Sequence, residues 1–219
     1  MAETLEGPVL EPAAGGAPEQ VVLFLHGVGA DGNDLIGLAP SFQKTLPGAL
    51  FLSPHAPFPF DLGPTGRQWF SIQDLNIRLD GVRRAAPILD AFIDETLEAH
   101  GLGADRLALV GFSQGTMMSL HVGLRRAAPV ACILGYSGML VGPERLAAEI
   151  RSRPPVMLVH GDADPVVPFS SLAGAVEALE ANGLDVDSHV CPGLGHGIGA
   201  DGLRLGMEFL GRVFGRPPA

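Results

Sequence analysis

The chain has 219 residues, of which 47% are apolar and 17% are charged. This length indicates one domain that can bury a sizeable core, and this apolar content excludes a chain that is disordered throughout. A net charge of −10 excludes the basic surface that binds nucleic acid or anionic lipid. The two cysteines, Cys132 and Cys191, are too few for a disulfide scaffold, and we expect reduced thiols in the core.

No stretch approaches the roughly 18 uninterrupted apolar residues of a membrane span, and the first residues lack the features of a secretory signal. We therefore expect a cytoplasmic protein without stable membrane insertion. Residues 1–18 contain scattered prolines and a Gly15-Gly16 pair, which predicts a flexible tail before a single domain over residues 19–219. The composition is compatible with a monomer or a homodimer.

Short β-branched and apolar runs predict strands, and longer segments with apolar residues at helical spacing predict helices. In chain order, the predicted strands are residues 21–25, 49–53, 106–110, 130–134, 156–159 and 186–190. The predicted helices are residues 80–100, 114–124, 170–181 and 203–213. This alternation predicts an α/β fold with a mostly parallel central sheet and helices on both faces. The proline-rich stretch 54–68 predicts a long irregular loop, the kind that often carries function.

The motif Gly111-Phe-Ser-Gln-Gly115 follows a predicted strand and opens a predicted helix. A serine on such a sharp strand-to-helix turn points its hydroxyl out of the sheet, and the flanking glycines avoid clashes across the turn. The helix N-terminus places free N–H groups beside a developing oxyanion. The pattern alone is weak, but this context favours Ser113 as a nucleophile over an ordinary capping serine.

A nucleophilic serine needs a base and an acid, in this architecture in the chain order Ser, Asp or Glu, His. His121 lies inside the helix after Ser113, His160 precedes the acid candidates, and His189 alternates within the last strand. The interpretation that remains is His196, in a glycine-rich loop after that strand, as the base.

The acid is expected in the loop after residues 156–159, where Asp162 and Asp164 compete. Pro165 restricts Asp164 to extended backbone, which favours Asp164 as the acid and leaves Asp162 as a turn residue. The oxyanion hole needs two backbone donors. We expect the N–H groups of Gln114, which follows the nucleophile, and of Val28, in the glycine-rich loop after the first predicted strand.

Two motifs in that first loop suggest other functions. Gly27-Val-Gly-Ala-Asp-Gly32 matches the dinucleotide fingerprint, but residues 35–60 contain no acidic residue to bind a ribose, which argues against a redox enzyme. The segment 31–34 is similar to a calcium loop, but the sixth position is Ile36 instead of glycine. We therefore expect Asp31 to cap a helix.

Six motifs occur in order: His26-Gly-x-Gly, Pro54-His-Ala-Pro57, Trp69-Phe70, the serine motif, Gly161-Asp-x-Asp-Pro-Val-Val-Pro168 and Gly195-His196. Together they resemble the phospholipase/carboxylesterase family, close to the acyl-protein thioesterases, within the α/β-hydrolases. The resemblance covers about residues 20–213. It implies a compact hydrolase without a large lid domain, with its triad on Ser113, Asp164 and His196 and its oxyanion donors on Val28 and Gln114.

The resemblance also implies that Trp69, Leu75 and Val167 line the acyl pocket, although Trp69 can equally be a packing anchor for its loop. The expected activity is hydrolysis of a small carboxylic ester through an acyl-enzyme, with no metal and no organic cofactor. An acyl-protein thioesterase or a lysophospholipase is the alternative among enzymes. A catalytically silent ligand-binding protein is the alternative from another class, because a fold does not determine a function.

Overall fold

The computed structural model describes residues 5–74 and 78–215. Within them, seven strands form one sheet in the spatial order β1-β3-β2-β6-β7-β8-β9. The bounds are β1 Val9–Leu10, β2 Gln20–Leu25, β3 Ala49–Leu52, β6 Leu107–Phe112, β7 Cys132–Tyr136, β8 Val156–Gly161 and β9 Val186–Cys191. All neighbours are parallel except β1, which pairs antiparallel with β3. The prediction of a mostly parallel sheet is confirmed.

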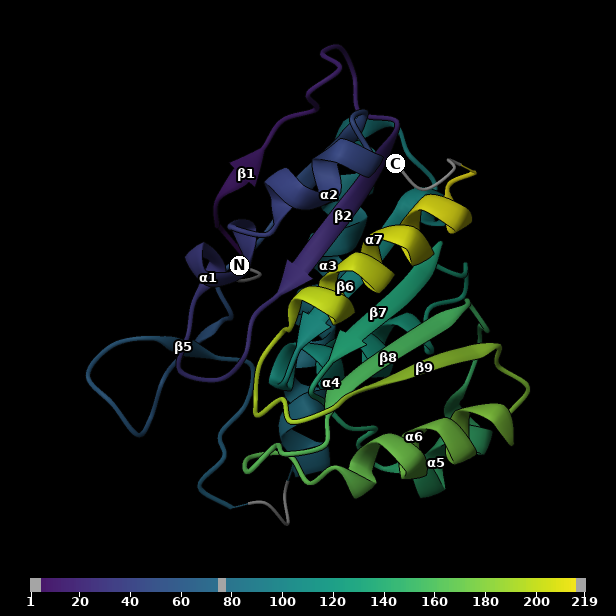
Figure 1. Cartoon of the computed structure of the whole chain (residues 1–219). Coiled ribbons are helices and arrows are strands. Elements are labelled where there is room, and N and C mark those ends of the chain that lie inside the picture. Colours follow the sequence, from purple (N-terminus) through teal and green to yellow (C-terminus); the bar gives the residue numbers. More distant parts are fainter. Residues whose placement is uncertain (1–4, 75–77, 216–219) are drawn as a thin grey trace.

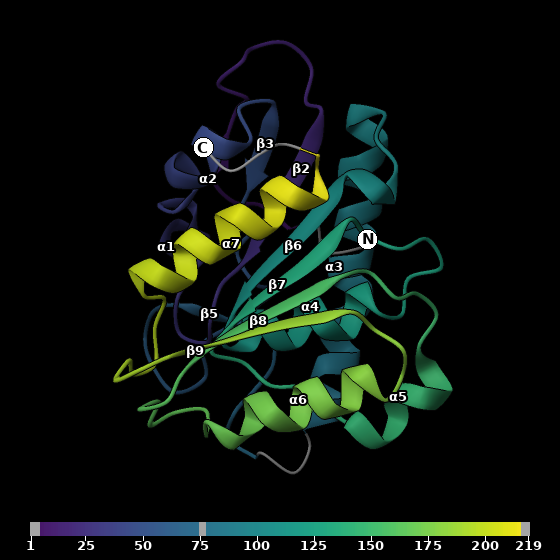
Figure 2. The same ribbon diagram turned by 45° about the vertical axis from the view of Figure 1, so that its right-hand side comes forward.

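Helices cover both faces of this sheet (Figures 1 and 2). One layer contains α1 Gly32–Ile36, α2 Ala39–Thr45 and α7 Ala200–Val213. The other contains α3 Arg78–His100, α4 Gln114–Gly123, α5 Pro143–Glu149 and α6 Ser170–Glu180. A short 3-10 helix, η2 Ala104–Arg106, leads into β6. No helix of residues 5–74 and 78–215 is long and apolar enough to cross a membrane.

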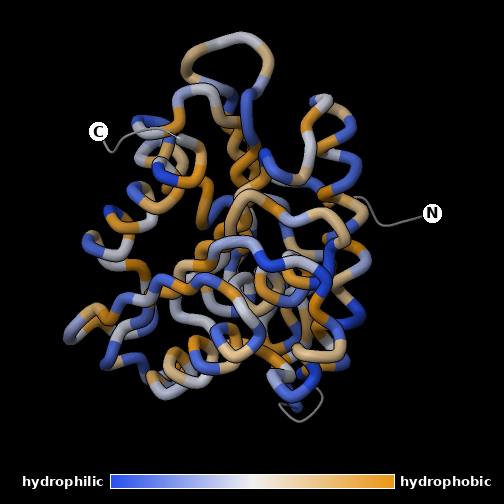
Figure 3. Tube along the Cα trace, turned by 90° about the vertical axis from the view of Figure 1, so that its right-hand side faces the viewer, coloured by the Kyte–Doolittle hydropathy of each residue, from blue (hydrophilic) through white to orange (hydrophobic). Residues whose placement is uncertain are grey.

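The core forms two clusters, one under each helix layer, because the central strands are buried on both sides. Every residue of β2, β7 and β8 is buried, as expected for continuous apolar strands between two helix layers. Figure 3 shows the hydrophobic chain segments gathered in the middle of the molecule. Both cysteines are free and buried, as predicted.

Three features differ from the sequence-based expectations. Residues 5–18 do not form a loose tail: β1 extends the sheet, and the Leu5 side chain is 6% exposed. Sequence periodicity cannot detect a two-residue strand whose partner lies about forty positions away. The second difference is a strand boundary: the strand predicted at residues 130–134 is β7, Cys132–Tyr136. It extends two residues further than predicted, because Gly135 and Tyr136 pair with the last residues of β6.

The third difference concerns short elements. The helices α1, α2 and α5 have five to seven residues, too few for a periodic pattern; the sequence indicates α1 only through its cap at Asp31 and does not predict α2 and α5. The proline-rich stretch 54–68 contains a small antiparallel pair, β4 Phe58–Pro59 with β5 Arg67–Gln68. Asp31 caps α1 by accepting a hydrogen bond from the Asn33 N–H at 2.8 Å, which confirms the interpretation of that motif.

Candidate active site

The carboxyl ends of the parallel strands meet at one edge of the sheet, where ligands bind in open α/β folds. Ser113 lies there, between β6 and α4, with φ 53° and ψ −114°. This left-handed conformation is costly for a residue with a side chain. It is held in part by a 2.9 Å hydrogen bond from the Ser113 N–H to the Tyr136 carbonyl. The strained turn predicted for this motif is therefore present.

The glycines flanking Ser113 are required by close backbone contacts. A Cβ on Gly111 would lie 2.4 Å from the Thr116 nitrogen, and one on Gly115 would lie 1.7 Å from the Leu25 carbonyl oxygen. Thr116 fastens the turn further, because its hydroxyl donates to the carbonyl groups of Gly111 and Tyr136 at 2.9 Å each. Any side chain at either glycine would move the nucleophile.

Asp164 follows β8, and its side chain is inaccessible to solvent. One carboxylate oxygen accepts the N–H groups of Val166 and Val167 at 2.8 and 3.0 Å, and the other lies 2.7 Å from His196 Nδ1. Burial alone would raise the pKa of Asp164, but the hydrogen bonds from His196 and the two backbone groups outweigh it and lower the pKa. Asp164 is therefore an ionised acceptor at neutral pH.

His196 follows β9 and is placed by Asp164. An ionised carboxylate only accepts hydrogen bonds, so the proton of the neutral imidazole is on Nδ1 and Nε2 has a free lone pair. The imidazole packs on Phe112, the residue before Ser113, with ring centroids 4.9 Å apart. The His196 ring therefore lies beside the turn that carries Ser113, with Nδ1 toward Asp164.

Hydrogen bonds join the loop that carries Asp164 to the loop that carries His196. Asp162 accepts the Gly193 N–H at 2.6 Å, which joins its loop to a distant one, and the Ala163 N–H donates to the Leu194 carbonyl at 3.1 Å. Ser137, at the end of β7, donates its hydroxyl to the Gly197 carbonyl at 3.1 Å. The position of His196 is therefore set by contacts on both sides of its loop.

The glycine-rich loop after β2 approaches the nucleophile closely. A Cβ on Gly27 would lie 3.3 Å from the Ser113 Cβ, so the neighbouring Val28 is at the nucleophile turn. Gln114 occupies the first position of α4, where the backbone N–H has no partner within the helix. Of the two residues expected to donate to an oxyanion, Gln114 therefore follows Ser113 in the chain and Val28 follows a glycine that packs against Ser113.

The chain is similar to known proteins over most of its length. The sequence pattern of the phospholipase/carboxylesterase family matches residues 10–213. The chain belongs to the phospholipase/carboxylesterase family. It is therefore an enzyme, an ester-bond hydrolase.

Individual members of the family agree with this assignment. Acyl-protein thioesterase 1 of Gibberella zeae is 29% identical over 208 residues, which cover 86% of this chain and 88% of that protein. Esterase YpfH of Escherichia coli is 29% identical over 195 residues, covering 88% and 82%. The crystal structure of esterase PE8 is 41% identical, covers 96% of this chain and 99% of its own, and superposes with a TM-score of 0.92. The fold is accordingly that of the α/β-hydrolases.

The three residues expected to line the family's acyl pocket have different outcomes. Leu75 lies outside the described residues. Trp69 is fully buried, and its indole donates to the His26 carbonyl at 3.1 Å, which favours the packing alternative. Val167 is 5% exposed, and its N–H is one of the donors to Asp164. The substrate-contacting role of Trp69 and Val167 stays a prediction.

Sequence reasoning did not identify a second histidine at the acid. His160, at the end of β8, is 1% exposed. Its Nε2 lies 3.1 Å from the Val167 carbonyl and 3.3 Å from Asp164 Oδ2, the oxygen that also contacts His196. Chain order argues against His160 as the base, but it carries no information about which residues support the loop of Asp164. The position of His160, four residues before Asp164, was the only signal in the sequence.

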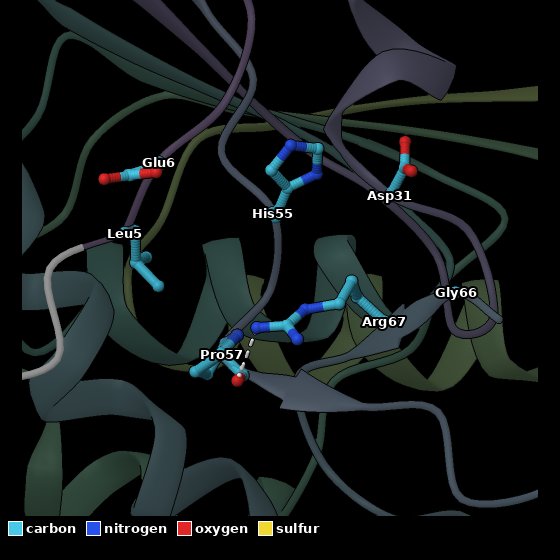
Figure 4. A pocket seen from close by; sticks show the side chains of 7 residues that line it. All are labelled: Leu5, Glu6, Asp31, His55, Pro57, Gly66 and Arg67. Atoms are coloured by element: carbon cyan, nitrogen blue, oxygen red, sulfur yellow. Dashed lines mark hydrogen bonds between the residues drawn. The ribbon is translucent and has the colours of Figure 1, made fainter.

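Two cavities have none of the three triad candidates among their lining residues. One, of about 410 Å³, is lined by polar and apolar residues together: Leu5, Glu6, Asp31, His55, Pro57, Gly66 and Arg67 (Figure 4). Another of about 270 Å³ is lined by Phe58, Gln68, Phe70, Ser71, Asp80, Gly81 and Arg84. Two residues that line this second cavity, Gln68 and Phe70, flank Trp69 in the chain.

Proposed function

We propose that this enzyme is a serine carboxylesterase that uses Ser113, His196 and Asp164 as its triad. The observation that carries this proposal is the 2.7 Å contact between Asp164 and His196, which leaves a basic Nε2 beside a nucleophile on a strained turn. The 41% identity to esterase PE8 favours an oxygen ester as substrate.

The mechanism follows from these positions. His196 Nε2 takes the proton of the Ser113 hydroxyl as its oxygen bonds to the ester carbonyl carbon. The N–H groups of Val28 and Gln114 donate to the resulting oxyanion, and Asp164 stabilises the imidazolium. The C–O bond of the ester then breaks, and His196 returns its proton to the leaving alcohol. Water, deprotonated by His196, then attacks the acyl carbon, and His196 returns that proton to the Ser113 oxygen as its bond to the acid breaks.

The test compares the wild type and Ser113→Ala on p-nitrophenyl esters of increasing acyl length. We expect turnover by the wild type, with an initial burst where deacylation is slow, and a loss of at least about 10³-fold in kcat for the alanine variant. Equal activity of the two proteins would show that Ser113 is not the nucleophile. Absence of turnover with ligand binding intact would favour a silent binding protein.

Thioester hydrolysis is a second candidate, because relatives named acyl-protein thioesterase 1 match 86% of the chain at 29% identity. Matched acyl thioesters and oxygen esters of one chain length separate the two activities. If kcat/KM for the thioester exceeds kcat/KM for the oxygen ester by more than about tenfold, the enzyme is a thioesterase.

A further inference from the structure

One short segment of this chain touches both halves of the expected oxyanion hole. It consists of residues 67–70, which include β5, and we call it the bridging segment. On one side it contacts the loop after β2, which carries Val28. On the other it contacts the side chain of Gln114, whose backbone supplies the second donor.

Arg67 fixes the loop on the C-terminal side of Val28. Its N–H donates to the Ala30 carbonyl at 2.7 Å, and its carbonyl accepts the Gly29 N–H at 2.8 Å. Its guanidinium donates to the Ala56 carbonyl at 2.8 Å and to the Pro57 carbonyl at 2.7 Å, the latter drawn in Figure 4. The backbone and the side chain of one residue therefore join two loops.

Trp69 fixes the N-terminal side of Val28. Its indole donates to the His26 carbonyl at 3.1 Å. His26 Nε2 accepts the Ala56 N–H at 2.9 Å, so its proton is on Nδ1, which donates to the Gly27 carbonyl at 2.7 Å. The backbone on both sides of Val28 is thus held by residues 67–70, with Ala56 as a shared partner.

The side chain of Gln114 joins the same segment to the nucleophile turn. Its Oε1 accepts the Trp69 N–H at 2.7 Å, and its Nε2 donates to the Phe70 carbonyl at 2.7 Å. Gln114 is 2% exposed, so both bonds are shielded from water. An amide satisfies a donor and an acceptor together, whereas a carboxylate would face the Phe70 carbonyl without a proton to donate.

We propose that the bridging segment sets the spacing between the Val28 and Gln114 N–H groups, with Arg67 and the Gln114 side chain as positioning residues. This inference rests on the proposed function, because it assumes an oxyanion between these donors. Backbone donors stabilise an oxyanion only at about 2.7–3.1 Å, and a displacement of about 1 Å can cost 10²-fold in rate. Neither positioning residue needs to touch the substrate.

The first test is Gln114→Glu, which preserves shape and backbone but removes the donor to Phe70. We expect kcat to fall about 10- to 100-fold while KM changes less than about threefold. The Ki of a boronic acid, which forms a tetrahedral adduct on the serine, should rise in parallel. Gln43→Glu is the matched control, because Gln43, on α2, also donates to a carbonyl, that of Glu11 at 2.8 Å, but through an exposed hydrogen bond.

The second test is Arg67→Lys, which preserves the charge but loses the planar pair of donors. We expect a loss in kcat of the same kind, about tenfold, with a parallel rise in the boronic acid Ki. Arg153→Lys is its control, because Arg153 donates to the Asn182 carbonyl at 2.7 Å in an exposed position. Rates are expressed per active site, counted by complete labelling with a fluorophosphonate, so a misfolded fraction does not lower them.

The outcomes separate the two proposals. If Ser113→Ala is inactive and the Gln114 and Arg67 variants keep wild-type kcat and boronic acid affinity, the bridging segment does not position the donors. The positioning role is also overturned if the Gln114 and Arg67 variants lose no more kcat than the Gln43 and Arg153 control variants. If Ser113→Ala retains wild-type activity, the proposed function itself fails. Should Gln114→Glu not fold, Arg67→Lys decides alone.

Discussion

Asp164 shows how one buried side chain can combine two structural tasks. Asp164 Oδ1 accepts the N–H groups of Val166 and Val167, which closes the turn that follows it. Asp164 Oδ2 lies 2.7 Å from His196 Nδ1 and orients that ring. His160 Nε2 lies 3.3 Å from the Asp164 oxygen that contacts His196. Burial raises the pKa of Asp164, but the hydrogen bonds from His196, Val166 and Val167 outweigh it and lower the pKa, so the carboxyl group is ionised at neutral pH.

We predict that Asp164→Asn loses about 10³- to 10⁴-fold in kcat, because an amide cannot accept from both His196 and the backbone while holding the correct tautomer. The control is Asp162→Asn, which can still accept the Gly193 N–H, and we expect a change below about tenfold. Burst and steady-state assays with a p-nitrophenyl ester measure both. Similar losses in the two variants would mean that the loop, and not the carboxylate of Asp164, matters.

At the scale of elements, the packing of α4 against β2 decides where the nucleophile stands. The first turn of α4 lies so close to the end of β2 that Gly115 has no room for a side chain. The helix is buried at every position from Gln114 to Gly123, so it cannot move outward without opening the core. A side chain at position 115 would therefore have to displace β2 or Ser113.

We predict that Gly115→Ala destabilises the protein by about 4 kcal/mol or prevents folding, because its Cβ would lie 1.7 Å from the Leu25 carbonyl oxygen. Gly174→Ala is the matched control: this exposed glycine of α6 has no atom within 4 Å of the added Cβ. That change should stabilise the helix by up to about 1 kcal/mol. Urea unfolding followed by circular dichroism measures both, and equal effects would contradict the contact.

At the scale of the whole molecule, buried histidines couple folding to pH. His121, 5% exposed in α4, has no hydrogen-bond partner for Nδ1 among the described residues. Burial first, and then the charge of Arg125, lowers the pKa of His121 to about 4. Burial also lowers the pKa of His26. The unfolded chain binds these protons near pH 6.5, so the stability present above that pH decreases as the pH falls.

We predict that the free energy of unfolding decreases between pH 7 and pH 4.5, with a share on the order of 2 kcal/mol from His121. His121→Leu should remove that share, so its stability should depend less steeply on pH. His100→Gln, at the exposed end of α3, is the control and should leave the slope unchanged. Urea titrations at both pH values provide the measurement, and identical slopes for all three proteins would refute the assignment.

From the sequence alone follow the α/β class, the six longer strands, the four longer helices and the candidates Ser113, Asp164 and His196. These are local properties, because continuous apolar runs predict buried strands and a glycine-flanked serine between a strand and a helix predicts a strained turn. The choice of Asp164 over Asp162 was also local, since Pro165 restricts the backbone there. In the structure, Asp164 contacts His196, and Asp162 contacts Gly193.

Only the tertiary structure decided which distant residues support these candidates. The pairing of β1 with β3 and the contact of His160 with Asp164 join segments through the fold. So do the bonds of Arg67 to the loop after β2 and those of the Gln114 side chain to residues 69 and 70. A single backbone or side-chain hydrogen bond leaves no periodic pattern in a sequence, and its partner is selected by packing. The candidate triad could therefore be predicted residue by residue, whereas the network that positions it became visible only when the strand ends met at one edge of the sheet.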